Sequence, residues 1–475
     1  MSRYMSPINN DSLISLCNEI KINDRIDSND YNRYGVKRGL RNNDGTGVMA
    51  GLTKICSVDG YYMEDGERVP RPGKLNFRGL DVNEIIAGCR KEDRFGYEEV
   101  AWLLIFGTLP TAEQLTKFSN VLAECRELPD DFIEDMIMKA PSPNIMNKMA
   151  RSVMALYSYD DNPDDISTEN VLRQCIQLIA QLPSIMSYAY QVKRRHYYKK
   201  SMYIHQPKRE LCTAQSILRT IRSDRLFTDE EAKLLDLCLI LHSEHGGGNN
   251  STFATRVLTS SGTDTYSAIA AGIGSLKGPK HGGANIKVKE MTSLMAEELD
   301  DITDEKQVAD YIAKLIRKEA GDRSGLVYGM GHAIYTMSDP RAELLKEAAR
   351  SFIYSEEFER RFRQLELIED LTPDIFRSIK GDMKPICANV DLYSGLIYDM
   401  LGIPEDLFTP LFTVSRMAGW AAHRIEELTT GKRIIRPAYK NVALPYHYIS
   451  LDKRTEENVM HPDKYIPSEA RAVLK

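Results

Sequence analysis

The segment TDEEAKLLDLCLILHSEH, residues 228–245, constrains the fold more than any other part of the chain. Thr228 and Glu231 have the spacing of a capping box, which predicts that a helix begins there. The positions from Leu234 to Leu241 are apolar on every side of that helix except at Asp236, so we expect it to be buried all round. Such a helix needs other helices packed around it, and its C-terminal end carries His242 into the interior.

Helical patterns continue along most of the chain after about residue 95. Thr111 and Gln114 repeat the capping-box spacing, and apolar residues of the following segment fall on one helical face. Strand-like alternation is limited to residues 51–63 and 74–79. The sequence therefore predicts a mainly α fold with a small β element near the N-terminus.

Length and charge narrow the class of protein. A chain of 475 residues exceeds one ordinary core, which predicts two or three units with a cleft between lobes. The net charge of −6 argues against a general nucleic-acid binder, and no apolar run approaches the roughly 20 residues that cross a bilayer. The eight scattered cysteines and an N-terminus without a signal pattern predict a reducing, cytoplasmic location.

Residues 192–210 form a local basic run with interleaved tyrosines. A solvated loop or helix end is the simpler interpretation, and a contact to a phosphate or a nucleic acid is the alternative. One such run in an acidic protein leaves both open.

The stretch HSEHGGGNN, which begins at His242, places polar side chains at the end of the buried helix. A divalent metal held by His242, Glu244 and His245 is one interpretation, although the HExxH spacing is absent. A structural role for both histidines is the second. The third is a site for an anion or a carbonyl group, because three glycines expose backbone N–H groups and Asn249 adds an amide. The sequence favours the third and leaves the other two open.

Two further histidines and one carboxylate lie near glycine-rich turns or apolar residues. His281 in KGPKHGGAN precedes a predicted helix start, where a neutral imidazole can stabilise an oxyanion; a core or capping histidine is the alternative. His332 in YGMGHAIY follows a flexible turn. Asp391 in CANVDLYSG has apolar neighbours, which raise the proton affinity of a carboxylate and suit a general base, although Asp is also a favoured N-cap.

Three arginines complete the set of candidate residues. Arg341 lies in the first turn of a predicted helix, directly after Pro340. Arg416 in TVSRMAGW and Arg436 in RIIRP lie in otherwise apolar contexts. Guanidinium groups match carboxylates in bidentate fashion, but single arginines more often form surface salt bridges.

The order of these segments resembles the citrate synthase family. The succession is HSEHGGGN, GPKHGGAN, GMGHAIY followed by SDPR, NVDLYSG, SRMAGW and RIIRP, and the resemblance covers about residues 50 to 440. It implies a mostly helical fold with a large and a small mobile domain. The implied bounds are an N-terminal extension at 1–50, a large domain at 51–284 and 401–475, and a small domain at 285–400.

The resemblance implies an acyltransferase that condenses acetyl-CoA with oxaloacetate and water to give citrate and CoA, a reaction of the tricarboxylic acid cycle. Asp391 would remove the α-proton of the acetyl group, His281 would stabilise the enolate, and His332 would polarise and protonate the oxaloacetate carbonyl. The implied contacts to oxaloacetate or citrate are His245, Asn249, Arg341, Arg416 and Arg436. The implied contacts to CoA, along residues 326–335 and beyond, are Val327, Gly329, Gly331, Ala333 and Lys384.

The resemblance also implies the partners of the chain. The substrates are oxaloacetate and acyl-CoA, the latter as co-substrate, with no metal and no other cofactor. Arg436 would reach across from a second subunit, so a homodimer is expected, and neither nucleic acid nor membrane is a partner. The chain departs from the family at Gly246, where Glu is common, at Lys280, and at Ala333, where many relatives carry a cation.

Three other functions are compatible with the sequence. The first is 2-methylcitrate synthase, which uses propionyl-CoA; one methylene in an acyl pocket is worth only about 1–3 kcal/mol, so motifs do not separate the two. The second is a non-catalytic relative that binds CoA. The third is a metalloenzyme built on His242, Glu244 and His245.

Overall fold

The computed structural model describes residues 26–455 apart from 43–44, 66, 382–384 and 444–447, together with residues 13, 14 and 17. The chain forms two compact units. Residues 50–435 make up one unit, and residues 1–49 with 436–475 make up the other. No helix among the described residues is both long and apolar enough to cross a membrane.

The described helices and strands follow one another in this order: α2 (Ser28–Arg33), η1 (Arg38–Leu40), β1 (Cys56–Glu64), β2 (Glu67–Phe77), β3 (Leu80–Asp81), α3 (Val82–Lys91), α4 (Tyr97–Phe106), α5 (Ala112–Glu124), η2 (Ile133–Met138), α6 (Ile145–Leu156), η3 (Tyr157–Tyr159), α7 (Thr168–His196), α8 (Thr213–Ile221), α9 (Asp229–His242), α10 (Asn250–Thr259), α11 (Thr265–Leu276), α12 (Ala284–Glu298), α13 (Glu305–Ile316), α14 (Pro340–Phe352), α15 (Glu356–Lys380), α16 (Asp391–Met400), η4 (Glu405–Leu407), α17 (Phe408–Thr430) and η5 (Leu451–Lys453). The prediction of a mainly α fold is confirmed.

The expected buried helix is α9, and both halves of its capping box are present. Thr228 Oγ1 accepts a hydrogen bond from the Glu231 N–H at 3.2 Å, and the Glu231 carboxylate accepts one from the Thr228 N–H at 2.8 Å. Every residue from Leu234 to His242 is buried. Asp236 interrupts the apolar run because its carboxylate accepts hydrogen bonds from the first N–H groups of α4, at Gly96 and Tyr97.

The small β element is a three-stranded antiparallel sheet in the order β1-β2-β3. Its glycines allow the segment 334–338 to lie directly on the strands. A Cβ on Gly60 would lie 2.7 Å from the carbonyl oxygen of Ile334, and one on Gly73 would lie 2.2 Å from that of Ser338. The Tyr335 hydroxyl donates a hydrogen bond to the Lys74 carbonyl at 3.3 Å. The sheet therefore supports the segment that follows His332.

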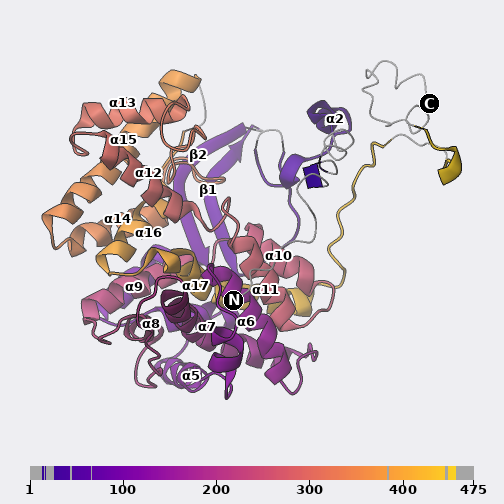
Figure 1. The fold of residues 1–475 in the computed structure, drawn as a ribbon, viewed down its shortest axis with the longest axis vertical. Coiled ribbons are helices and arrows are strands. Elements are labelled where there is room, and N and C mark those ends of the chain that lie inside the picture. Colours follow the sequence, from indigo (N-terminus) through magenta and orange to yellow (C-terminus); the bar gives the residue numbers. More distant parts are fainter. Residues whose placement is uncertain are drawn as a thin grey trace. The chain divides into compact units, whose positions relative to one another are not determined.

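Within the 50–435 unit, helices α12 to α16 pack mainly on one another and gather together in Figure 1. They contact the remaining helices through α9 and α17. Helix α17 also packs against α4, α7 and α10, and its residues from Phe408 to Arg424 are all buried. The elements that carry the candidate site residues meet around α9 and α17.

Candidate active site

His245 follows the C-terminal end of α9 and lies among aromatic rings. Its ring centroid is 5.1 Å from that of His332 and 5.6 Å from that of Tyr335. The side chain is buried and its Nε2 atom has no hydrogen-bond partner. Burial, and then the charge of Arg341, hold the pKa of His245 well below its usual range, so the imidazole is neutral.

His332 is fixed by the backbone of its own turn. Its Nδ1 atom accepts hydrogen bonds from the Ile334 and Tyr335 N–H groups, each at 3.1 Å. Its ring stacks on Tyr335 at 4.7 Å. Because Nδ1 is an acceptor, the proton of the neutral ring is on Nε2. His332 therefore has the tautomer of a hydrogen-bond donor through Nε2.

Two buried guanidinium groups lie near these imidazoles. Arg341, in the first turn of α14, donates from Nε and Nη2 to the Asp339 carboxylate at 3.0 and 2.7 Å. Arg416 in α17 is fully buried, and its Nε donates to the His242 carbonyl at 2.7 Å. Both terminal nitrogens of Arg416 have no partner. A buried, unpartnered guanidinium is costly and suits the carboxylate of a ligand.

Asp391 is the first residue of α16, and it does not cap that helix. The N-cap is Val390, and the Oδ1 of the preceding Asn389 accepts a hydrogen bond from the Asp391 N–H at 3.0 Å. The capping alternative for Asp391 is therefore wrong. Burial raises the pKa of the Asp391 carboxyl to about 6, against the opposing charges of Arg341 and Arg416. A carboxylate with this pKa is ionised at neutral pH and is a stronger base than an exposed one.

His281 lies just before α12 and is held by α10. Its Nε2 is 3.1 Å from the Ser251 hydroxyl. Burial, and then the charge of Arg416, lower the pKa of His281 to about 4, so this imidazole is neutral as well. The positive charge of Arg416 contributes to lowering the pKa of His245, His281 and Asp391 alike.

Three residues that we expected to contact the substrates are not part of this buried group of imidazoles, guanidinium groups and Asp391. Asn249 is the N-cap of α10, and its Oδ1 accepts from the Ser251 N–H at 3.3 Å and hydroxyl at 2.9 Å, which leaves its amide nitrogen for a ligand. Arg436 is exposed and belongs to the other compact unit. Lys384 lies outside the described residues.

The expected CoA segment is shaped by glycine conformations. Gly329 and Gly331 have φ angles of 83° and 88°, which favour glycine. A Cβ on Gly329 would also lie 2.7 Å from the Leu392 side chain. Val327 is buried and Ala333 is exposed. The segment therefore runs close along α16, beside Asp391.

Several supporting residues were missed by the sequence analysis. Asn389 donates from its amide to the Gly331 carbonyl and from its backbone N–H to the Gly329 carbonyl, each at 2.9 Å, so it ties the start of α16 to the turn before His332. Asp339, Ser251 and His423 were also overlooked. Only Asp339, an acidic residue directly before a proline, carried a sequence signal, that of an N-cap.

Glu244 is one of the three residues that could have formed a metal site. Its carboxylate is directed towards α17. Its Oε1 accepts a hydrogen bond from the Gly246 N–H at 2.6 Å and is 3.1 Å from His423 Nε2. Within the described part of the chain, no group of three or more His, Cys, Asp or Glu side chains is arranged to hold a metal ion.

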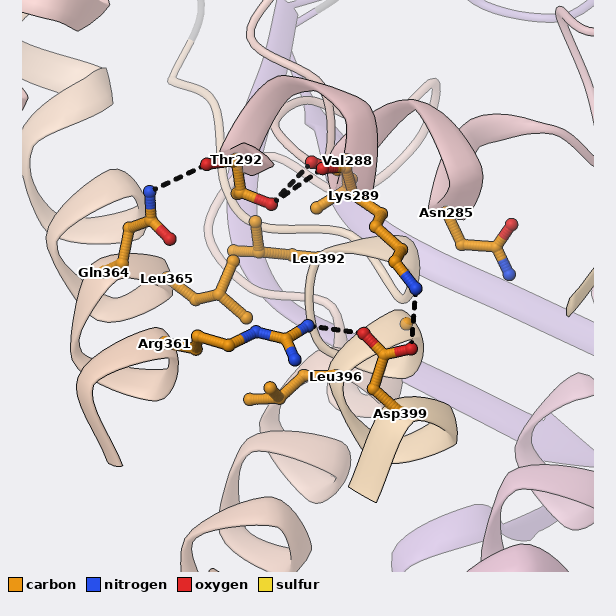
Figure 2. Close-up of a pocket in the computed structure, with 11 residues that line it drawn as sticks. Asn285, Val288, Lys289, Thr292, Arg361, Gln364, Leu365, Leu392, Leu396 and Asp399 are labelled. Carbon is orange, nitrogen blue, oxygen red and sulfur yellow. Dashed lines mark hydrogen bonds and ion pairs between the residues drawn. The ribbon is translucent and has the colours of Figure 1, made fainter. Parts of the chain in front are cut away.

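A second polar region lies between α12, α15 and α16, around a cavity of about 20 Å³ (Figure 2). The Asp399 carboxylate contacts Lys289 Nζ at 2.8 Å and the guanidinium of Arg361. The Gln364 amide donates to the Thr292 carbonyl at 3.3 Å. This volume suits about one water molecule, too little for a substrate.

Comparisons with known proteins identify the family of the chain. Residues 41–438 match the family model described as citrate synthase, C-terminal domain. The citrate synthase of Haloferax volcanii is 31% identical over 409 residues, which cover 85% of this chain and 94% of the relative. The 2-methylcitrate synthase 1 of Corynebacterium glutamicum is 31% identical over 414 residues, 86% of this chain and 96% of the relative.

Solved structures give the same result. The citrate synthase of Thermoplasma acidophilum, in a ternary complex with carboxymethyl coenzyme A and oxaloacetate, superposes with a TM-score of 0.70 at 27% identity, covering 86% of this chain and 97% of that one. That of Thermotoga maritima gives 0.69 at 28% identity, covering 88% and 99%. The chain belongs to the citrate synthase family and is a transferase of that type.

Proposed function

We propose that this enzyme condenses acetyl-CoA with oxaloacetate and water to give citrate and CoA. The observation that carries the proposal is the surroundings of Arg416. A buried guanidinium with two unpartnered nitrogens is accompanied by neutral imidazoles at His245 and His281 and by Asp391, whose pKa is raised to about 6. Dicarboxylate binding and proton removal from a weak carbon acid need these parts together.

In this mechanism Asp391 takes a proton from the methyl group of acetyl-CoA. His281 donates a hydrogen bond to the thioester oxygen as it becomes an enolate. His332 donates through Nε2 to the oxaloacetate carbonyl, which becomes a hydroxyl as the enolate carbon bonds to the carbonyl carbon. Water then cleaves the thioester and releases CoA.

Oxaloacetate is held through both carboxylates. Arg341 and Arg416 bind them, and His245 and the Asn249 amide add hydrogen bonds. Arg436 enters from a second subunit, so the active enzyme is a homodimer. The support for these substrates is the solved relative that holds oxaloacetate and carboxymethyl coenzyme A.

CoA lies along Val327, Gly329, Gly331 and Ala333. Residues 285–400 act as a small domain that closes over both substrates and excludes water, while the remainder of the 50–435 unit acts as the large domain. The packing of α12 to α16 mainly on one another supports this division. The enzyme uses no metal or further cofactor and acts in the cytoplasm.

The second candidate is 2-methylcitrate synthase, because a relative of that name is as similar as the citrate synthases. Thiol release from acetyl-CoA and from propionyl-CoA, each with and without oxaloacetate, separates the two. A higher kcat/KM with acetyl-CoA supports the proposal, and a higher value with propionyl-CoA supports the second candidate. No oxaloacetate-dependent thiol from either would leave a CoA-binding relative.

A further inference from the structure

His423 in α17 is a fully buried histidine that the mechanism does not use. Its Nε2 lies 3.1 Å from the Glu244 carboxylate, and its Nδ1 lies 2.8 Å from Nη1 of Arg256. A guanidinium only donates, so Nδ1 is the acceptor and the proton of the neutral ring is on Nε2. His423 therefore donates to Glu244.

Arg256 is itself fixed by two carboxylates. Its terminal nitrogens contact Glu426 and Glu427, each at 2.8 Å, and all three side chains are largely buried. Arg256 belongs to α10, the helix that Asn249 caps. A chain of hydrogen bonds thus leads from α10 through His423 to Glu244, the residue before His245.

Glu244 in turn holds the backbone directly after His245. Its Oε1 accepts the Gly246 N–H at 2.6 Å, where φ is 88°. Burial alone raises the pKa of Glu244, but His423, Arg416 and this N–H hold it below its usual range, so the group is a carboxylate. The ring of His423 also lies close under the loop, because a Cβ on Gly247 would be 3.3 Å from its Cε1 atom.

One face of α17 carries this arrangement and Arg416 together. Arg416, Gly419 and His423 are spaced by three and four residues, so they share a helical face. A Cβ on Gly419 would lie 2.2 Å from Oε2 of Glu244 and 2.4 Å from the Ser243 carbonyl. At Gly419, between Arg416 and His423, the helix backbone therefore lies in close contact with the Glu244 carboxylate.

We propose that His423 is a positioning residue for oxaloacetate. By holding the Glu244 carboxylate, it fixes the loop of His245 relative to Arg416 and prevents Glu244 from turning to the guanidinium, which stays available to the substrate carboxylate. His423 itself does not touch the substrate. The inference rests on the proposed function and adds to it a determinant of oxaloacetate binding.

The test compares His423→Phe, which keeps a ring but loses both hydrogen bonds, with His423→Gln, whose amide can still donate to Glu244. Thiol release gives kcat and both KM values, and titration calorimetry gives the Kd of oxaloacetate. For His423→Phe we expect the KM and Kd of oxaloacetate to rise about tenfold, the effect of one hydrogen bond to a charged group. The KM of acetyl-CoA stays within about twofold, and His423→Gln recovers part of the loss.

Two further variants keep the outcome decisive. Arg256→Leu leaves His423 in place but frees its Nδ1, and we expect a smaller rise in the same KM. Lys117→Gln, on the exposed side of α5, is the control and changes neither constant. A merely structural role lowers the melting temperature without changing the KM of the folded enzyme.

The results separate the two proposals. An inactive wild-type enzyme contradicts the proposed function. An active enzyme whose oxaloacetate KM and Kd are unchanged in His423→Phe, or in Arg256→Leu if that first variant does not fold, overturns the role of His423.

Discussion

The 50–435 unit contains two polar regions that differ in how their charged side chains are paired. At the end of α9, both ring nitrogens of His242, Oε2 of Glu244, Nε2 of His245 and the terminal nitrogens of Arg416 are buried without partners. Between α12, α15 and α16, the Asp399 carboxylate is shared by Lys289 and Arg361 (Figure 2). Unpartnered buried polar groups cost stability, so we infer that the first region binds a ligand, whereas the ion pairs of the second region connect helices.

The largest expected effect is on Asp391. Asp391→Asn keeps the shape of the side chain but removes the base, and we expect kcat to fall by about 10³-fold or more. The Kd of oxaloacetate should change little, because the guanidinium groups remain. Thiol release and titration calorimetry measure the two quantities. Near-normal turnover in this variant would assign the proton transfer to another group.

Arg416→Met tests the unpartnered guanidinium itself. We expect the KM of oxaloacetate to rise about 10²-fold, since a charged hydrogen-bond pair with a carboxylate is lost. The melting temperature should stay level or rise, because a buried cation is removed. The matched variant Arg361→Met removes a paired guanidinium, so it should lower the melting temperature and leave the KM unchanged. The same response from both variants would break the contrast between the regions.

The pH dependence of activity follows from Asp391 in particular. Its pKa is raised to about 6, and only the ionised form accepts a proton, so kcat/KM should fall about tenfold per pH unit below 6. His281, with a pKa lowered to about 4, and His245, with a pKa well below its usual range, stay neutral and add no limb between pH 5 and 8. A rate profile that is flat down to pH 5 contradicts this assignment.

The same shift predicts a stability effect of known sign. A carboxyl with a raised pKa binds its proton more tightly in the folded state, so its contribution is fully present below the unfolded pKa near 4 and is lost as pH rises through about 6. The free energy of unfolding of the wild type, relative to that of Asp391→Asn, should therefore fall as the pH rises from 4 to 6. Denaturant titrations at several pH values measure it.

The sequence predicted those parts of the site that depend on local patterns. The capping box of α9, its buried apolar run and the glycines around His245 are all visible in consecutive residues. Asn389 and His423 were not predictable, because each acts on a partner brought near by folding. Asn389 reaches the Gly331 carbonyl 58 residues away, and His423 reaches Glu244 at a separation of 179 residues. An asparagine or histidine with such a partner looks in sequence like any other.

The smallest effect is expected in the paired region. Asp399 is 13% exposed and connects α12 and α15 to the C-terminal turn of α16, whose first residue is Asp391. Asp399→Asn should lower the free energy of unfolding by about 1 kcal/mol, because partly exposed ion pairs contribute little. Both KM values and kcat should stay within about twofold, since the amide oxygen still accepts a hydrogen bond from one of the two cations. A large loss of kcat at normal stability would mean that this cluster also aligns Asp391, and the two regions would then act as one.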